Sequence, residues 1–297
     1  MTALMSRPRQ SPPTAGVPRR VGVPMLVAVV AAAGVAALYR VFVRTVTGQA
    51  ADTGALNGAD VSHAQVVAVL SRTLNATTLV SLVAVCLAAA AIGVIRRRAD
   101  LAIAAAVLVI GANATTQLLK THLHRPNLDG LPAPNSFPSG HTTAAASVAF
   151  ALVLALPAAV RGLVALVGAL YVTIIAVATV WAEWHRPSDT VAGLLVVLSW
   201  GAVMSAGLRT HRARRPGSGI GPGRVTSMVL AAVFAVTAIG GLIGLASVVL
   251  DERHAAVDVV SVRFTFLTGA ACMTAAVAGT FLLWIRLAAA DHPVPRR

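Results

Sequence analysis

Charged residues are scarce in this chain. They make up 11% of its 297 residues, whereas hydrophobic residues make up 57%. A water-soluble domain usually contains about 25% charged residues, and a chain with far fewer cannot cover a folded globule of this size with polar groups. The composition therefore excludes an ordinary soluble protein. Together with a mean hydropathy of +0.79, it predicts an all-α protein whose helices cross a membrane.

Cysteines and aromatic residues are also few. The two cysteines, Cys86 and Cys272, lie inside apolar runs without metal-ligand spacing, so we interpret them as small core residues. Aromatic residues make up 4% of the chain, which is too few to stack many nucleic-acid bases. The net charge of +14 comes from arginines clustered between apolar runs, a pattern typical of charges that orient membrane helices. We therefore predict membrane lipids, and no nucleic acid, as partners.

Several apolar runs reach or exceed the roughly 20 residues that a helix needs to cross the hydrocarbon of a bilayer. The first run is long for the apolar region of a signal peptide and has Arg40 near its end, which favours a retained anchor helix. We predict a polytopic bundle of about eight transmembrane helices, at residues 23–45, 76–95, 101–119, 142–160, 163–182, 190–208, 226–249 and 264–288.

The predicted spans divide the chain into four parts. Residues 1–22 are rich in Arg, Pro and Ser and are predicted to form a disordered basic tail on the cytoplasmic side. Residues 23–208 are predicted to form a six-helix membrane core. Residues 209–225 would then be a cytoplasmic linker, and residues 226–290 would contain two additional transmembrane helices.

Basic and acidic residues are distributed unevenly over the predicted loops. If the N-terminus is cytoplasmic, 16 of the 24 basic residues lie on the inner side and 8 of the 10 acidic residues lie on the outer side. This arrangement agrees with the positive-inside rule. We therefore predict an integral plasma-membrane protein with both termini in the cytoplasm.

Three outer segments differ from ordinary connections between helices. Residues 46–75 contain Gly and Asp and are predicted to be a loop with a short helix at 61–74. Residues 120–141 and 183–189 concentrate ionisable side chains against one face of the membrane. Such a concentration indicates a functional site.

One of these segments ends with Pro138-Ser139-Gly140-His141, directly before a predicted span. The unpaired N–H groups at the start of a helix attract anions, and the helix dipole adds to this attraction. Ser139 would add a hydroxyl donor. The same residues would also serve as an ordinary N-terminal cap.

Another segment contains His185 and Asp189, four residues apart, where the next span begins. On a helix this spacing places both side chains on one face. A carboxylate bonded to one imidazole nitrogen leaves the other nitrogen free as a nucleophile. We therefore expect His185 and Asp189 to hydrogen bond, and His141 and His185 to face one cavity. The alternative is an interfacial histidine and an aspartate that complements the helix dipole.

Lys120, the single lysine of the chain, ends the third predicted span, and Arg125 follows five residues later. Cations are favoured at the C-terminal end of any helix, but a phosphate ester also needs clustered positive groups to hold its oxygens. Cations, an anion-binding turn and a His–Asp pair thus come from three separate segments on the same side of the membrane. Their co-occurrence predicts a phosphate site.

These residues resemble the motifs of the phosphatidic acid phosphatase type 2 family, which is related to the vanadium haloperoxidases and the bacterial acid phosphatases. That family has Lys-x6-Arg-Pro, Pro-Ser-Gly-His and Ser-Arg-x5-His-x3-Asp, in this order. The chain has the second motif whole, at residues 138–141, and the end of the third motif as His185-Arg186-Pro187-Ser188-Asp189. The resemblance covers about residues 76–208 and leaves out the last two predicted spans.

The resemblance implies a metal-independent phosphatase without a cofactor. It would hydrolyse a lipid-linked phosphate or pyrophosphate at the extracytoplasmic face. It implies His185 as the nucleophile that forms a phosphohistidine, Asp189 as the residue that orients it, and His141 as the acid that protonates the leaving oxygen. The phosphate-binding residues implied or considered are Lys120, Ser139, Gly140 through its backbone, Arg125 and Arg186.

Two departures from the family pattern concern the cations. Four residues separate Lys120 from Arg125, where the family has six. The Ser-Arg pair that precedes the nucleophilic histidine is absent, and Ala178-Thr179 stands in its place. We therefore consider Arg125 as a ligand from a shifted position and Arg186 as a substitute cation. On a helix, Arg186 would point about 100° away from the histidine beside it.

Two further interpretations stay open. The missing arginine is compatible with a non-catalytic relative that binds or moves an anionic lipid. A metal-dependent enzyme would use the histidines of the outer segments, which are His122, His124, His141 and His185. However, His122 and His124 are two residues apart in a proline-flanked loop, and the sequence has no HExxH-like pair.

Overall fold

The computed structural model describes residues 17–58, 98–128, 130, 135–212, 223–251 and 259–290, together with positions 72, 84, 88, 91 and 95. This part of the chain is helical and contains no strand. Its helices are α1 (Val17–Leu38), which continues into a π-helical turn (Tyr39–Val43), α2 (Val46–Asn57), α4 (Ala99–His122), α5 (Gly140–Ala155), α6 (Ala158–Trp181), α7 (Pro187–Arg212), α8 (Arg224–Asp251) and α9 (Val259–Ala290).

The predicted all-α, membrane-spanning bundle is confirmed. In the described part of the chain, six helices are long and apolar enough to cross a membrane, and α5 is a shorter apolar helix of 16 residues. These helices correspond to all predicted spans except the one at 76–95, nearly all of which lies outside the described residues.

The predicted boundary between the spans at 142–160 and 163–182 is wrong. α5 ends at Ala155, and α6 begins at Ala158. Pro157 is the N-cap of α6, with a φ of −58°. Proline has no N–H to donate inside a helix, while its fixed φ suits the start of one. The proline therefore separates the two helices earlier than the apolar pattern suggested.

The predicted loop at 46–75 needs a second correction, because its first part forms helix α2. Thr45 caps this helix, and its hydroxyl accepts a hydrogen bond from the N–H of Gly48 at 3.0 Å. A Cβ on Gly48 would lie 1.9 Å from the carbonyl oxygen of Val41, so glycine is required for the turn into α2. The short helix predicted at 61–74 falls almost entirely outside the described residues.

The neighbouring helices extend into the predicted tail and linker. α1 already begins at Val17, with Pro18 in its first turn, where proline is tolerated. α7 continues to Arg212, and α8 begins at Arg224. Residues 1–16 and 213–222 of the predicted tail and linker lie outside the described part of the chain.

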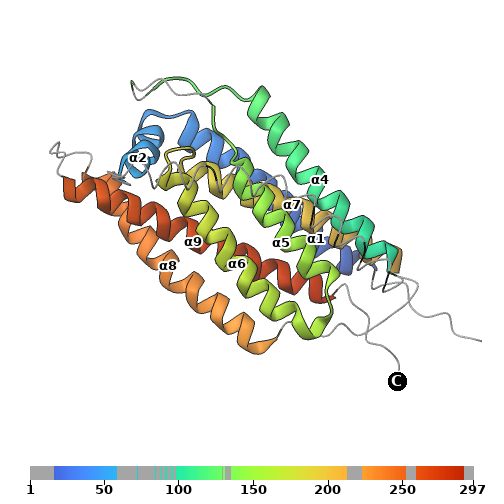
Figure 1. Ribbon diagram of the computed structural model, residues 1–297. Coiled ribbons are helices and arrows are strands. Elements are labelled where there is room, and N and C mark those ends of the chain that lie inside the picture. Colours follow the sequence, from blue (N-terminus) through green and yellow to red (C-terminus); the bar gives the residue numbers. More distant parts are fainter. Residues whose placement is uncertain are drawn as a thin grey trace, which may run out of the picture.

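α7 is the central helix of the bundle. Of its most apolar stretch, 61% is buried inside the protein, compared with 17% for α8. α7 packs against α1, α4, α5 and α9, whereas α8 packs mainly against α9. In Figure 1, α4 and α8 lie on opposite sides of the bundle. The start of α7, which carries one of the predicted motifs, is therefore surrounded by other helices.

α9 is part of the bundle core, although it follows the segment that resembles the phosphatase family. The rings of Phe150 in α5 and Trp284 in α9 stack at 4.9 Å, and Phe281 meets Phe150 edge to face at 5.1 Å. The indole N–H of Trp284 donates to the carbonyl of Phe150 at 3.1 Å. Close packing and hydrogen bonds hold helices together in lipid, where apolar burial drives association little.

The two ends of the bundle carry different groups. The predicted site residues all lie where α4 and α6 end and where α5 and α7 begin. At the opposite end, Arg161 and Arg209 donate to the carbonyls of Ala288 at 3.5 Å and Leu287 at 3.0 Å. These contacts place two cations at the C-terminal end of α9, where the helix dipole favours positive charge.

α5 and α7 approach each other closely at Gly193. A Cβ at this position would lie 2.8 Å from the carbonyl oxygen of Ser139 and 2.9 Å from the hydroxyl of Thr143. Because the nearer atom belongs to the backbone of Ser139, the N-cap of α5, it cannot rotate away as a side chain could. Glycine is therefore required where the second and third motifs meet.

We expect Gly193→Ala to lower the thermal unfolding midpoint of the detergent-solubilised protein, because the added methyl group forces α5 and α7 apart. Overpacking of this kind usually costs about 1–3 kcal/mol. Gly207→Ala, on the same helix, is the control, because nothing lies within 4 Å of its added Cβ. Equal midpoints for the two variants would contradict the close approach.

Candidate active site

The ends of several helices meet at one end of the bundle and bring the predicted site residues together. α4 ends there, α5 and α7 begin there, and the loops between them complete the site. The residues are Lys120 and Arg125 at and after the end of α4, Ser139, Gly140 and His141 at the start of α5, and His185, Arg186 and Asp189 at the start of α7.

The buried carboxylate of Asp189 joins three of these segments. Its Oδ1 accepts a hydrogen bond from Arg125 Nη2 at 2.7 Å. Its Oδ2 accepts hydrogen bonds from the hydroxyl of Ser136 at 2.5 Å and from the backbone N–H of Arg186 at 2.9 Å. The side chains of Arg125 and Asp189 are only 3% and 0% exposed. Removing one partner of a buried ion pair typically costs about 3–5 kcal/mol, so this contact strongly constrains the site.

The rings of His141 and His185 lie next to each other, with centroids 5.8 Å apart in an edge-to-face arrangement. The ring of Trp184 also lies next to His141, at a centroid distance of 5.2 Å. Lys120 is half-buried and interacts electrostatically with both His141 and Asp189. The second and third motifs therefore meet in space.

The expected hydrogen bond between His185 and Asp189 is not formed. His185 Nδ1 lies 3.8 Å from Asp189 Oδ2, which is too far. The expectation placed both residues on one helix, but α7 begins only at Pro187. His185 therefore precedes the helix, and its backbone N–H instead donates to the carbonyl of Thr179 at 3.2 Å.

Three buried polar atoms at this site have no hydrogen-bond partner among the described residues. They are Nε and Nη1 of Arg125 and Nδ1 of His185. Buried polar groups are nearly always hydrogen bonded, and leaving one unpaired typically costs about 1–3 kcal/mol. A guanidinium with unpaired N–H groups, bonded to the carboxylate that lies beside His185, is suited to bind an oxygen-rich anion.

Ser139 forms the N-cap of α5. Its Oγ accepts hydrogen bonds from the backbone N–H of Thr142 at 3.3 Å and from the Thr142 hydroxyl at 3.1 Å. Its own backbone N–H donates to the carbonyl of Asp189 at 2.8 Å. The capping interpretation is therefore confirmed, while phosphate binding by Ser139 stays a prediction. At Gly140 an added Cβ would meet nothing closer than the amide nitrogen of Gln117, at 3.9 Å, so packing does not require glycine there.

A comparison with known families connects this geometry to a protein class. The family model of the PAP2 superfamily matches residues 101–213. This segment of the chain is therefore similar to the PAP2 superfamily. The match points to phosphatase activity on phosphate esters. No curated protein and no solved structure matches the chain.

The PAP2 match starts after α2, yet α2 holds one of the loops of the site. Gln49 of α2 is buried, and its Nε2 donates to the carbonyls of Val43 and Pro126, each at 2.7 Å. Its Oε1 accepts a hydrogen bond from the backbone N–H of Leu128 at 3.2 Å. Gln49 thus holds the loop on both sides of Asn127, directly after Arg125 and Pro126.

α2 also holds the loop that carries His185, the nucleophile candidate. The carboxylate of Asp52 accepts hydrogen bonds from the backbone N–H of Ser188, at 3.0 Å, and from the Ser188 hydroxyl. Thr53 accepts a hydrogen bond from Arg186 Nε at 3.1 Å. Because α7 begins at Pro187, Arg186 precedes the helix. The expected helical rotation of about 100° between His185 and Arg186 therefore does not apply. Its side chain reaches α2, and its role in binding phosphate stays a prediction.

Sequence reasoning did not identify Gln49, Asp52 or Thr53 as residues of the site. The available signal was Thr45, a residue type favoured at the N-cap of a helix. Asn135 was missed as well. Its Nδ2 donates to the carbonyls of Lys120 at 3.1 Å and Leu123 at 2.8 Å, which ties the second motif to the end of α4.

Of the four histidines considered as metal ligands, His141 and His185 lie next to each other, but no cluster of three is formed among the described residues. His122 is exposed, and its Nδ1 lies 2.9 Å from the carbonyl oxygen of Leu118 in its own helix. His124 is exposed in the loop that follows. Within the ranges that the structure describes, no group of three or more His, Cys, Asp or Glu residues is arranged to hold a metal ion.

Asp52 is a buried acid outside the membrane-spanning segments. Burial, and after it the nearby charge of Asp189, raises the pKa of Asp52 from 3.8 to about 7, although hydrogen bonds from Ser188 oppose the shift. A carboxyl group whose pKa is raised on folding binds its proton more tightly in the folded state. Its contribution to stability is therefore greatest below the unfolded pKa and is lost as the pH rises through the folded pKa.

We predict that Asp52→Asn reduces the pH dependence of the thermal unfolding midpoint between about pH 5 and pH 8. The wild-type midpoint should fall more steeply with rising pH, because Asp52 becomes charged in a buried position. The variant has no carboxyl group at this position and keeps an acceptor for Ser188. Parallel curves for the two proteins would show that Asp52 does not titrate in this range.

Gln49→Ala is predicted to loosen the loop at 123–128, because it removes the three side-chain hydrogen bonds of Gln49. Hydrogen–deuterium exchange should become faster at the amide of Leu128, and the KM for a phosphate ester should rise as Arg125 becomes less well held. Asn57→Ala is the matched control, since Asn57 is an exposed amide on the same helix. Faster exchange with an unchanged KM would show that this loop does not help to bind the ester.

Proposed function

We propose that this protein is an integral membrane phosphatase that hydrolyses a lipid-linked phosphate or pyrophosphate through a phosphohistidine intermediate. The observation that carries the proposal is the cluster of buried, partly unpaired groups around Asp189. Arg125 contacts the carboxylate directly, the ring of His185 lies beside it, and the ring of His141 adjoins that of His185. Within the PAP2 match, this cluster combines a nucleophile, an acid and a cation in one place.

In the proposed first step, Nε2 of His185 attacks the phosphorus atom. Its Nδ1 faces Asp189, and a closure of about 1 Å would bring this pair into hydrogen-bond range. The bond to the leaving oxygen breaks, and His141 gives that oxygen a proton. In the second step His141 takes a proton from water, which attacks the phosphohistidine and releases phosphate. General acid–base catalysis of this kind contributes about 10²–10⁴-fold to the rate.

Positive groups would hold the phosphate oxygens during both steps. Arg125 has two buried nitrogen atoms without a described partner, and the charge of Lys120 acts on both His141 and Asp189. The N–H groups at the start of α5 add the favourable end of a helix dipole. Together these groups would stabilise the negative charge that develops in the transition state.

We place the site at the extracytoplasmic face and both termini in the cytoplasm. The support is the uneven distribution of basic and acidic residues over the predicted inner and outer loops. In agreement with it, Arg161 and Arg209 lie at the end of the bundle opposite the site. A site at the end of transmembrane helices suits a substrate whose tail stays in the lipid while its phosphate reaches water. The proposed substrate is therefore a phosphorylated membrane lipid.

One observation favours a second candidate, a relative that binds an anionic lipid without cleaving it. Asp189 is already bonded to Arg125, Ser136 and the backbone of Arg186, and it is not hydrogen bonded to His185. If this arrangement persists with substrate bound, His185 would lack the carboxylate that orients it. Such a protein would bind lipid phosphate but release no inorganic phosphate.

The decisive experiment measures phosphate release from a panel of lipid phosphates in the presence of a chelator. We expect the wild type to be active and His185→Ala to lose at least ~10²-fold in kcat. His122→Ala is the control, because His122 is exposed at the end of α4. Alkaline quenching during turnover should trap phosphate on the wild type but not on His185→Ala.

The outcomes separate the candidates. Release that persists in His185→Ala would overturn the phosphohistidine mechanism. Lipid phosphate binding without any release by the wild type would favour the non-catalytic relative. Activity that the chelator abolishes and added metal restores would point to a metal-dependent enzyme instead.

A further inference from the structure

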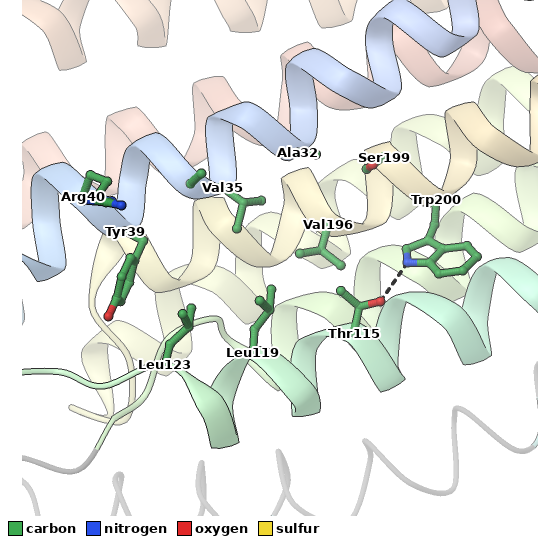
Figure 2. A pocket seen from close by; sticks show the side chains of 11 residues that line it. Ala32, Val35, Tyr39, Arg40, Thr115, Leu119, Leu123, Val196, Ser199 and Trp200 are labelled. Carbon is green, nitrogen blue, oxygen red and sulfur yellow. Dashed lines mark hydrogen bonds between the residues drawn. The ribbon is translucent and has the colours of Figure 1, made fainter.

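A cavity of about 480 Å³ lies between α1, α4 and α7, next to the candidate active site. Figure 2 shows its lining, with Arg40 and Tyr39 at one end and Trp200 at the other. Ligand pockets usually have volumes of about 300–1,000 Å³, so this cavity is large enough for a substantial part of a ligand. Ala32 and Ala36 of α1 line it and are exposed, which shows that the cavity is open as a groove along α1.

The groove is continuous with the loops of the site. Leu119 and Leu123 line it, and they adjoin Lys120 and the loop that contains Arg125. The hydroxyl of Tyr39 donates to the carbonyl of His124 at 2.7 Å. The outer end of the groove therefore borders the segment that carries both cations.

The deep end of the groove offers little to a polar ligand. The indole N–H of Trp200 donates to the hydroxyl of Thr115 at 3.0 Å, and the hydroxyl of Ser199 donates to the carbonyl of Ala28 at 3.1 Å. The polar groups there are thus bonded to the protein, and the remaining lining is aliphatic or aromatic. A ligand that fills this end must be apolar.

The charge at the outer end is positive. Arg40 is exposed and lines the groove on the side where Tyr39 meets the site loops. A molecule that matches the whole groove therefore has a long apolar part and an anionic end. A lipid-linked phosphate has this shape and charge.

We propose that the groove between α1, α4 and α7 binds the hydrocarbon chain of the lipid phosphate substrate, with Arg40 beside the anionic headgroup. This inference rests on the proposed function. The chain would enter sideways from the membrane past Ala32 and Ala36, and its phosphate would then lie beside the site loops. The groove, rather than the polar site, would therefore set the preference for long-chain substrates.

The test compares Ala36→Phe with Ala37→Phe. Ala36 lines the groove, whereas Ala37 is its exposed neighbour on the same helix and does not line it. We expect Ala36→Phe to lower kcat/KM on a long-chain phosphatidate at least tenfold, about the loss expected when roughly two methylene groups leave the groove. Activity on p-nitrophenyl phosphate, which has no hydrocarbon chain, should stay unchanged, and Ala37→Phe should change neither. Ala32→Phe and Ala33→Phe provide a second matched pair.

A binding measurement separates failure of this inference from failure of the proposed function. A phosphatidate with a photoreactive group in its chain is crosslinked to the wild type, and the labelled peptides are mapped. Labelling around 32–40 that Ala36→Phe abolishes would support the groove even if the wild type releases no phosphate. The inference is overturned if the active wild type is labelled mainly on α8. It is also overturned if Ala36→Phe affects both substrates equally or affects neither.

Discussion

The carboxylate of Asp189 is the point at which the separate segments of the site are joined. It is completely buried at the start of the central helix, and its two oxygens accept three hydrogen bonds. One comes from the loop after α4, one from the segment before α5 and one from the residue before α7. A buried carboxylate needs such partners because desolvation penalises its charge. The electrostatic requirement of one residue therefore sets the relative position of three loops.

The helices and the meeting of the motifs were predictable from the sequence. Long apolar runs fix the spans, and spans that alternate in direction bring the ends of the third and fifth to the face where the fourth and sixth begin. The relation between His185 and Asp189 was not predicted correctly, although Pro187 was a usable signal. Proline is common at the first position of a helix, and a helix that begins at Pro187 cannot place His185 on its face.

Other parts of the site were beyond sequence reasoning for physical reasons. The contact between Arg125 and Asp189 depends on how the loop after α4 folds, and no periodic pattern describes that loop. α2 was predicted as a loop because glycine is a poor helix former, and the contacts of Gln49 and Asp52 with distant backbone atoms hold it in place. The family pattern places an arginine before the nucleophilic histidine. This chain has Thr179 at that position. The guanidinium that contacts Asp189 belongs instead to Arg125, in the loop after α4.

Helix α2 lies before the segment that matches the family. The residues that build the site therefore extend over a longer part of the chain than the residues that identify the family. The PAP2 match covers residues 101–213 and contains all the motif residues. Gln49 and Asp52 lie before it, separated from it by the predicted second span, yet they hold the loops on both sides of the site. A fragment cut to the matched segment would keep the sequence signature of a PAP2 domain and lose the scaffold that shapes its loops.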